Sequence, residues 1–139
     1  MNRRLQREII VLSLYSIELS NNNIYDTVHF ILQQKNVASR ATDFIIDCIK
    51  GVIENKEKID EIISLNLVNY KIERLSLLDL AIIRFATYEL LLNEINYTII
   101  INEAIELTKL YSDLGDKKAP AFNNKLLDNI KTYLYESSW

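Results

Sequence analysis

Three arginines lie within one helical turn near the start of the sequence: Arg3, Arg4 and Arg7. Guanidinium groups bind phosphate through paired hydrogen bonds. Arg3 and Arg7 are four residues apart and share one face of a helix. We expect all three to stand clear of the core, because they precede a long apolar segment. The pattern fits a phosphate-binding edge, and it fits equally well three charges that keep an apolar helix in solution.

A second basic pair, Lys117 and Lys118, lies in the stretch 112–121, which we expect to be a loop. Phe122 follows directly and is a candidate for stacking on a nucleobase, although the ring could also be part of the core. If the two basic clusters are neighbours in space, they form one basic edge on an acidic protein. Such an edge would suit RNA, whose backbone supplies the phosphates.

Residues that could support catalysis are few. Glu103 and Glu106 share a helix face, but Lys109 three residues further on favours a solvated face with an ion pair. His29 is the only histidine and has no evident nucleophile beside it, and Cys48 is the only cysteine. A zinc site built on cysteines and a disulfide within the chain are excluded. We therefore expect a protein that is not an enzyme and has neither metal nor cofactor.

The composition bounds the fold class. The chain has 139 residues, a formal net charge of −3 and 49% hydrophobic residues, which favours a single domain, 1–139, with a proper core. Two glycines and one proline disfavour a turn-rich β protein, and no segment alternates as a strand would. No apolar run approaches the roughly 20 residues that span a bilayer, and the N-terminus does not read as a signal peptide. We expect a soluble, cytoplasmic, all-α protein.

The apolar spacing predicts a compact bundle of about seven helices. The first is apolar on nearly every side, so it must be central to the fold or covered by a partner. The expected helices span about residues 5–19, 24–34, 44–52, 54–63, 77–92, 99–111 and 122–136.

Two helix starts carry capping signals. Ser39 can cap the third helix, and Ser76 with Asp79 forms a capping box for the fifth. In the first helix, Ile9 and Leu12 lie near one face and are expected to face the core.

Four motifs, in order, resemble the NusB family of bacterial transcription antitermination factors. Together they extend over nearly the whole chain, from about residue 3 to 131. They are Arg7-Glu8 followed by "LYS" (14–16), "LSLLDLAIIRFATYELL" (75–91), "INEAIELTK" (101–109), and the set Phe122, Asn124, Leu127 and Asp128. Within the third motif, the polar pair Asn102-Glu103 interrupts an apolar run, and we expect it to tie this helix to a neighbour.

The resemblance implies an all-α fold of two helical subdomains packed around the N-terminal helix. It also implies a partner, the ribosomal protein NusE, with which family members bind the boxA element of nascent RNA. The pair helps to build an antitermination complex on RNA polymerase, notably for ribosomal RNA. Two alternatives stay open: a helical protein-interaction adaptor without RNA binding, and the RNA-binding module of ribosomal RNA cytosine methyltransferases.

The resemblance also assigns residues to surfaces. The RNA side comprises Arg3, Arg4, Arg7, Lys117, Lys118 and Phe122, and the NusE side comprises Tyr15, Asp79 and Tyr111. Tyr15 is also a candidate aromatic contact for RNA or a core residue. The chain departs from the common family pattern at Gln6, Leu12, Ala121 and Lys125. The last two changes lie on the expected RNA side, so the RNA sequence preference stays open.

Overall fold

The computed structural model describes residues 1–38 and 42–136, and this part of the chain contains only helices and their connections. The all-α prediction is therefore confirmed. None of the described helices is both long and apolar enough to cross a membrane. In chain order the elements are α1 (Arg3–Ser20), α2 (Ile24–Gln34), α3 (Asp43–Glu54), α4 (Lys56–Leu65), the 3-10 turn η1 (Ile72–Arg74), α5 (Leu77–Leu92), α6 (Tyr97–Tyr111) and α7 (Lys118–Glu136).

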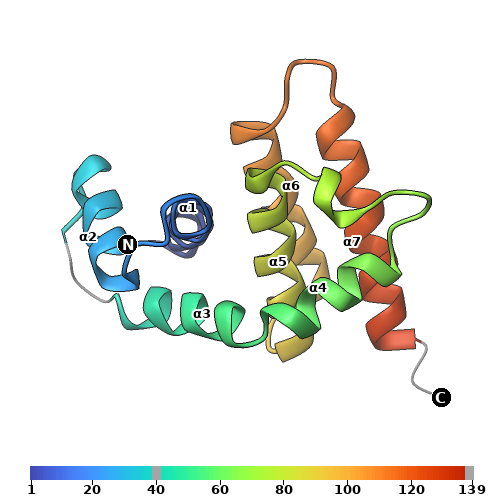
Figure 1. Cartoon of the computed structure of the whole chain (residues 1–139), viewed down its shortest axis with the longest axis horizontal. Coiled ribbons are helices and arrows are strands. Elements are labelled where there is room, and N and C mark those ends of the chain that lie inside the picture. The colour runs from blue at the N-terminus through green and yellow to red at the C-terminus, as the bar shows by residue number, and fades with distance from the viewer. Residues whose placement is uncertain (39–41, 137–139) are drawn as a thin grey trace.

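The helices form two groups that meet at α1. Helices α2 and α3 pack on one side of α1, and α5 packs on the other side together with α4, α6 and α7 (Figure 1). In this view α1 is seen end-on while α5, α6 and α7 run upright beside it. The arrangement agrees with the two subdomains around the N-terminal helix that the resemblance implied.

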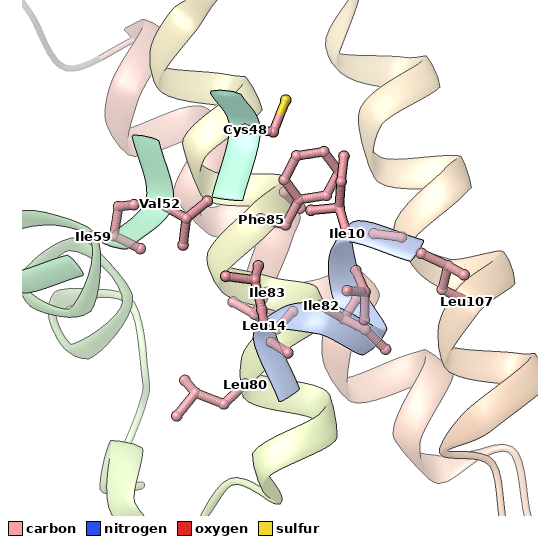
Figure 2. Packing of buried hydrophobic residues seen from close by; sticks show 14 of the residues in the cluster. Ile10, Leu14, Cys48, Val52, Ile59, Leu80, Ile82, Ile83, Phe85 and Leu107 are labelled. Carbon is pink, nitrogen blue, oxygen red and sulfur yellow. The ribbon is translucent and has the colours of Figure 1, made fainter. Parts of the chain in front are cut away.

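Helix α1 is apolar on nearly every side because both groups cover it. Ile10 and Leu14 lie beside Ile82, Ile83 and Phe85 of α5, and all five are buried (Figure 2). One hydrophobic cluster extends through both groups of helices. The sequence left two alternatives for α1, a central helix or one covered by a partner, and the observed packing supports the first.

Leu12 is only half-buried and packs at the edge of that cluster, whereas Ile9 is fully buried. The two residues are three positions apart, but α1 turns Leu12 partly toward solvent. The expectation that both face the core therefore holds fully for Ile9 alone.

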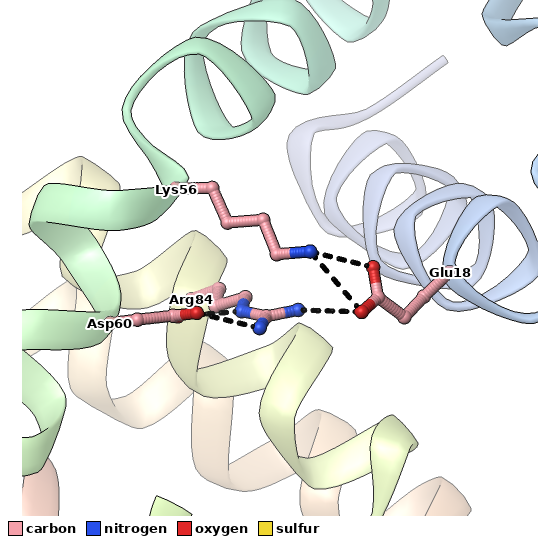
Figure 3. Close-up of polar contacts among 4 residues, drawn as sticks. All are labelled: Glu18, Lys56, Asp60 and Arg84. Carbon is pink, nitrogen blue, oxygen red and sulfur yellow. Dashed lines mark hydrogen bonds and ion pairs between the residues drawn. The ribbon is translucent and has the colours of Figure 1, made fainter.

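A network of four charged side chains joins the end of α1 to the second group of helices (Figure 3). Arg84 on α5 donates two hydrogen bonds of 2.8 Å to Asp60 on α4. Its guanidinium also lies 3.8 Å from Glu18 of α1, and Lys56 of α4 donates to the same carboxylate at 3.1 and 3.2 Å. The Arg84 side chain is only 11% exposed, so water and salt screen the attraction within its ion pairs less than they screen a surface pair.

Gly51 explains a close approach between α3 and α5. A Cβ atom at this position would lie 2.1 Å from the hydroxyl of Tyr88 on α5, which is far inside van der Waals contact. The glycine that falls inside the predicted helical pattern thus has a packing reason, although glycine weakens a helix interior.

The predicted cap of α5 is present in part. Ser76 Oγ accepts a hydrogen bond from the Asp79 amide at 3.1 Å. In a complete capping box, the Asp79 carboxylate would accept a hydrogen bond from the Ser76 backbone N–H. Here it accepts one from Ser76 Oγ instead, at 2.9 Å. The predicted cap Ser39 lies outside the described residues. Thr42 stands at the start of α3, and its side chain makes no capping hydrogen bond.

Helix α7 begins at Lys118, four residues earlier than predicted. Pro120 suggested a loop, but proline is tolerated in the first turn of a helix, where the missing N–H would have no intrahelical partner. The Lys118 amide instead donates to the side chain of Asp116 at 3.0 Å. As a result, Lys118 and Phe122 lie one turn apart on the same helix rather than on a loop and a helix.

Candidate nucleic-acid interface

Arg7 is buried, which corrects the expectation that all three N-terminal arginines stand clear of the core. Its Nε and Nη2 atoms each donate to a carboxylate oxygen of Glu89 on α5 at 3.2 Å. Both side chains are only 7% exposed. The guanidinium is therefore committed to an ion pair within the protein and is not free to bind phosphate.

Arg3 and Arg4 remain exposed in the first turn of α1. Arg4 donates to both carboxylate oxygens of Glu103 on α6, at 3.0 and 3.1 Å, and its side chain is still 66% exposed. The prediction that the Asn102-Glu103 pair ties its helix to a neighbour is thus confirmed for Glu103. Arg3 lies over the ring of Phe44, with its guanidinium carbon 3.8 Å from the ring centroid.

The two exposed arginines stand where the helix dipole disfavours positive charge. The N-terminal end of a helix carries partial positive charge, so cations in the first turn are unfavourable and anions are favoured. The first turn of α1 contains no acidic residue. Two cations at one helix end are a suitable setting for a phosphate group, and the Asn2 side chain already caps this end by accepting a hydrogen bond from the Leu5 amide.

The start of α7 carries exposed cations that no carboxylate pairs with in the described part of the chain. Lys117 and Lys118 are both exposed, and Lys117 has a backbone φ of +62°, which turns the chain into the helix. Phe122, one turn after Lys118, is 37% exposed. Its ring centroid lies 5.2 Å from that of Tyr70. The predicted RNA residues of this segment therefore do share one helix end.

A polar network fixes the start of α7 against α5 and α6. The buried Asn123 side chain donates to Asp79 Oδ1 at 3.0 Å and to Thr108 Oγ1 at 3.1 Å. Ser112 Oγ donates to the same Asp79 oxygen at 2.7 Å. Asn123 was missed from the sequence, although a polar residue at a core-facing helical position is a signal that could have found it.

The expected NusE-side residues differ in how they are held. Asp79 is half-buried and accepts the hydrogen bonds just described, so it has a structural role as well as any contact role. Tyr15 is half-buried and packs against the core. Tyr111 is also half-buried, and its hydroxyl donates to Glu8 of α1. Lys35, directly after α2, donates to the same carboxylate at 2.5 Å.

These contacts affect the ionisation of Glu8. Burial alone would raise the pKa of this carboxyl, but hydrogen bonds from Lys35 and Tyr111 outweigh burial, and the pKa is lowered. Glu8 therefore joins α1 to α2 and α6 in its charged form.

Two open hollows of about 500 Å³ each lie along the α6–α7 face, and both are lined by Asn102 and Asn124. Arg4 lines the first hollow, while Ala121 and Lys125 line the second. The exposed start of α1 and the first turns of α7 therefore border one polar surface. Two departures from the family pattern, at 121 and 125, fall on this surface.

Lys118 lies on the other flank of α7. It borders a hollow of about 430 Å³ together with Asp79 and Tyr111, two of the expected NusE-side residues. Gln6, another departure from the family pattern, is buried, and its side chain accepts a hydrogen bond from Arg3 at 3.0 Å.

Groups suited to catalysis or metal binding do not gather at this surface. Within residues 1–38 and 42–136, no three His, Cys, Asp or Glu side chains lie close enough to hold a metal ion. Cys48 is buried, and burial raises the pKa of its thiol to about 12, so it stays protonated and unreactive. Lys109 pairs with Glu106 at 3.6 Å on an exposed face, as the sequence predicted.

The sequence matches the NusB family over residues 4–132. The chain belongs to the NusB family. It is 38% identical to the transcription antitermination protein NusB of Bacillus pumilus, over 96% of this chain and 98% of that protein. The resemblance stated from the four motifs is confirmed.

Solved structures agree with this membership. A NusB structure from T. maritima matches with a TM-score of 0.82 and 31% identity, over 95% of this chain and 92% of that one. A crystal structure of the antitermination factors NusB and NusE in complex with double-stranded RNA also matches. Its TM-score is 0.82 and its identity 25%, over 94% of this chain and 96% of that one.

The burial of Arg7 generates a stability prediction. Arg7→Ala leaves Glu89 charged and buried, which should lower the free energy of unfolding by about 3–5 kcal/mol. The matched control is Arg4→Ala, which removes an exposed pair and should leave the urea midpoint close to wild type. A double Arg7→Met, Glu89→Leu variant should recover much of the loss. An Arg7→Ala midpoint equal to that of Arg4→Ala would show that the pair contributes no more than a surface contact.

The lowered pKa of Glu8 predicts a pH dependence. Because the folded-state pKa lies below the unfolded value, the stabilisation from Glu8 is fully present above the unfolded pKa and is lost as pH falls through the folded pKa. Glu8→Gln should therefore destabilise the protein at pH 7, and the difference from wild type should shrink in acid. Urea unfolding of both proteins at a series of pH values measures this difference in the free energy of unfolding. A difference that stays constant down to pH 3 would contradict the prediction.

Proposed function

We propose that this chain is a transcription antitermination factor that pairs with ribosomal protein NusE and binds boxA RNA of nascent transcripts, notably ribosomal RNA. The pair works in the bacterial cytoplasm as part of an antitermination complex on RNA polymerase. Family membership and the match to a NusB–NusE complex with RNA support this proposal. The observation that carries it is the exposed basic segment at the start of α7, which pairs with no carboxylate in residues 1–38 and 42–136 and stands beside an exposed aromatic ring.

On the RNA side, the proposed phosphate contacts are Arg3, Arg4, Lys117 and Lys118. Phe122 is the proposed stacking residue, because single-stranded RNA is recognised through unstacked bases on aromatic rings. Arg7 has a positioning role, since its pair with Glu89 fixes the α1 helix whose first turn presents the other two arginines.

On the protein side, we propose that NusE covers the surface formed by Tyr15, Asp79 and Tyr111. Lys118 borders the same hollow as the last two residues, so the partner and RNA surfaces adjoin at the start of α7. An RNA bound there can contact both proteins at once.

The net charge explains why a partner is needed. A protein with a formal net charge of −3 and a small basic edge neutralises few phosphates and should bind RNA weakly alone. A basic partner adds phosphate contacts and completes the surface. The proposed role involves no catalysis. The Bacillus pumilus relative, matched over 98% of its own length, is an antitermination protein, which favours this role over a methyltransferase module.

The first test is RNA binding with and without the partner. Fluorescence anisotropy with a labelled boxA RNA should show weak binding by this chain alone and at least tenfold tighter binding once NusE is added. Association of the chain with NusE but equal affinity for boxA and for a scrambled RNA would favour the adaptor alternative. No association with NusE would contradict the proposal.

The second test separates phosphate contacts from base contacts. Replacing Lys117 and Lys118 with Ala should weaken the NusE complex similarly for boxA and a scrambled RNA, because phosphate contacts carry no sequence information. The slope of log K against log salt should become shallower by about 0.7 per lost contact on a single strand. Phe122→Ala should weaken binding with an unchanged slope. An unchanged slope in the lysine variant would place the phosphate contacts elsewhere.

A further inference from the structure

A second aromatic ring and a guanidinium group extend the exposed surface of Phe122. Tyr70 lies in the connection between α4 and α5, and its ring centroid is 5.2 Å from that of Phe122 at an interplanar angle of 52°. The guanidinium carbon of Arg74, in η1, lies 5.0 Å from the Tyr70 centroid. Three planar groups from two distant segments therefore follow one another along the surface. In Figure 1 the short helix η1 lies beside the half of α7 that contains its start.

The ring of Tyr70 is held in place before any ligand arrives. It is half-buried and packs against the core, and its hydroxyl donates to the Arg74 carbonyl oxygen at 3.2 Å. Phe122 is 37% exposed, so the ring pair is not closed off from solvent as a core pair would be. A fixed, partly exposed aromatic ring loses little conformational entropy on binding, which favours stacking of a flat ligand.

Charge around the rings favours an anionic ligand. Lys71 and Arg74 are both exposed, and neither is paired with a carboxylate among the described residues. Lys71 also lines an open hollow of about 660 Å³ together with Tyr70 and the acidic Glu73. Lys118, one turn before Phe122, adds a further cation on the other side. Positive charge exceeds negative charge on the η1 side, where Lys71 and Arg74 stand against Glu73, whereas Lys118 borders a hollow that also contains Asp79 and Asp116.

We propose that Tyr70 and Arg74 form a second base-stacking position for single-stranded RNA, continuous with Phe122. Arg74 would stack its guanidinium plane on a base, and Lys71 would bind the adjoining phosphate. Aromatic rings and guanidinium planes are the groups on which unstacked RNA bases lie, and such stacking tolerates any base. The inference rests on the proposed RNA-binding function and adds to it a strand path from α7 toward the α4–α5 connection.

The test measures boxA affinity of variant chains in complex with NusE. Tyr70→Ala should weaken binding by about 5- to 150-fold, the range for losing one base–aromatic stack, with an unchanged salt slope. Tyr70→Phe keeps the ring but loses the hydrogen bond to the Arg74 carbonyl oxygen, so it should bind more tightly than Tyr70→Ala. Arg74→Lys keeps the positive charge but loses the planar guanidinium group that would stack on a base, so it should also weaken RNA binding.

Tyr25 supplies the matched control. It is an exposed tyrosine with Lys50 over its ring at 5.2 Å, and it lies on α2, far from α7 in Figure 1. Tyr25→Ala should leave RNA affinity unchanged. Circular dichroism and urea unfolding establish that each variant is folded.

A second measurement does not depend on variants. BoxA RNA carrying 5-iodouridine, irradiated in complex with the wild-type chain and NusE, should cross-link to Tyr70. Wild-type affinity of Tyr70→Ala, or cross-links that avoid residues 70–74, would overturn this inference while leaving the proposed function intact. Weaker NusE binding with unchanged RNA affinity would instead show that the rings contact NusE and not RNA. Failure of the wild-type complex to bind boxA would overturn both.

Discussion

The structure depends on covering helix α1 on both sides. Its apolar residues are buried against α2 and α3 on one side and against α5 on the other. The buried pair between Arg7 and Glu89 lies within the contact of α1 with α5, where a misplaced helix would leave two charges without partners. Because desolvated charges demand good geometry, we infer that this pair helps to fix the rotation and the position of α1. The same rotation presents Arg4 to Glu103 on α6.

The protein thus divides its basic residues between two tasks. The arginines of α1 contact Glu89, Glu103 and the ring of Phe44, so they order the helix that carries them, and the exposed Arg3 and Arg4 also belong to the proposed RNA surface. The lysines at the start of α7 have no such partners in the described chain and stand near the exposed ring of Phe122. The polar network of Asp79 and Asn123 holds that segment in place. We infer that an RNA strand encounters a rigid surface, which limits the entropy lost on binding.

Much of the fold could be predicted from the sequence, because helical periodicity and capping are local. The apolar pattern of the first helix and the cap at Ser76 lie within a few residues of the elements they specify. The same reasoning placed the start of α7 too late, since Pro120 was taken as a loop residue although a first helical turn accepts proline. Helix boundaries depend on such single residues, whereas the existence of a helix depends on many.

The site was less predictable because its contacts join distant segments. Arg7 and Glu89 are 82 residues apart, and no local pattern shows that the arginine is buried. Tyr70 and Phe122 likewise meet only through the packing of the α4–α5 connection on α7. The four motifs gave the family correctly, but family membership alone did not separate the arginines that hold the fold from those that remain exposed.

We propose that RNA binds along the first turn of α1, the start of α7 and the α4–α5 connection. Amide-resolved NMR of the isotope-labelled chain in complex with unlabelled NusE tests this most directly, by comparing spectra with and without boxA RNA. Resonances near residues 3–5, 70–74 and 117–125 should shift, and those of α2 should stay unchanged. Shifts confined to α2 and α3, or none at all with RNA in excess, would contradict it.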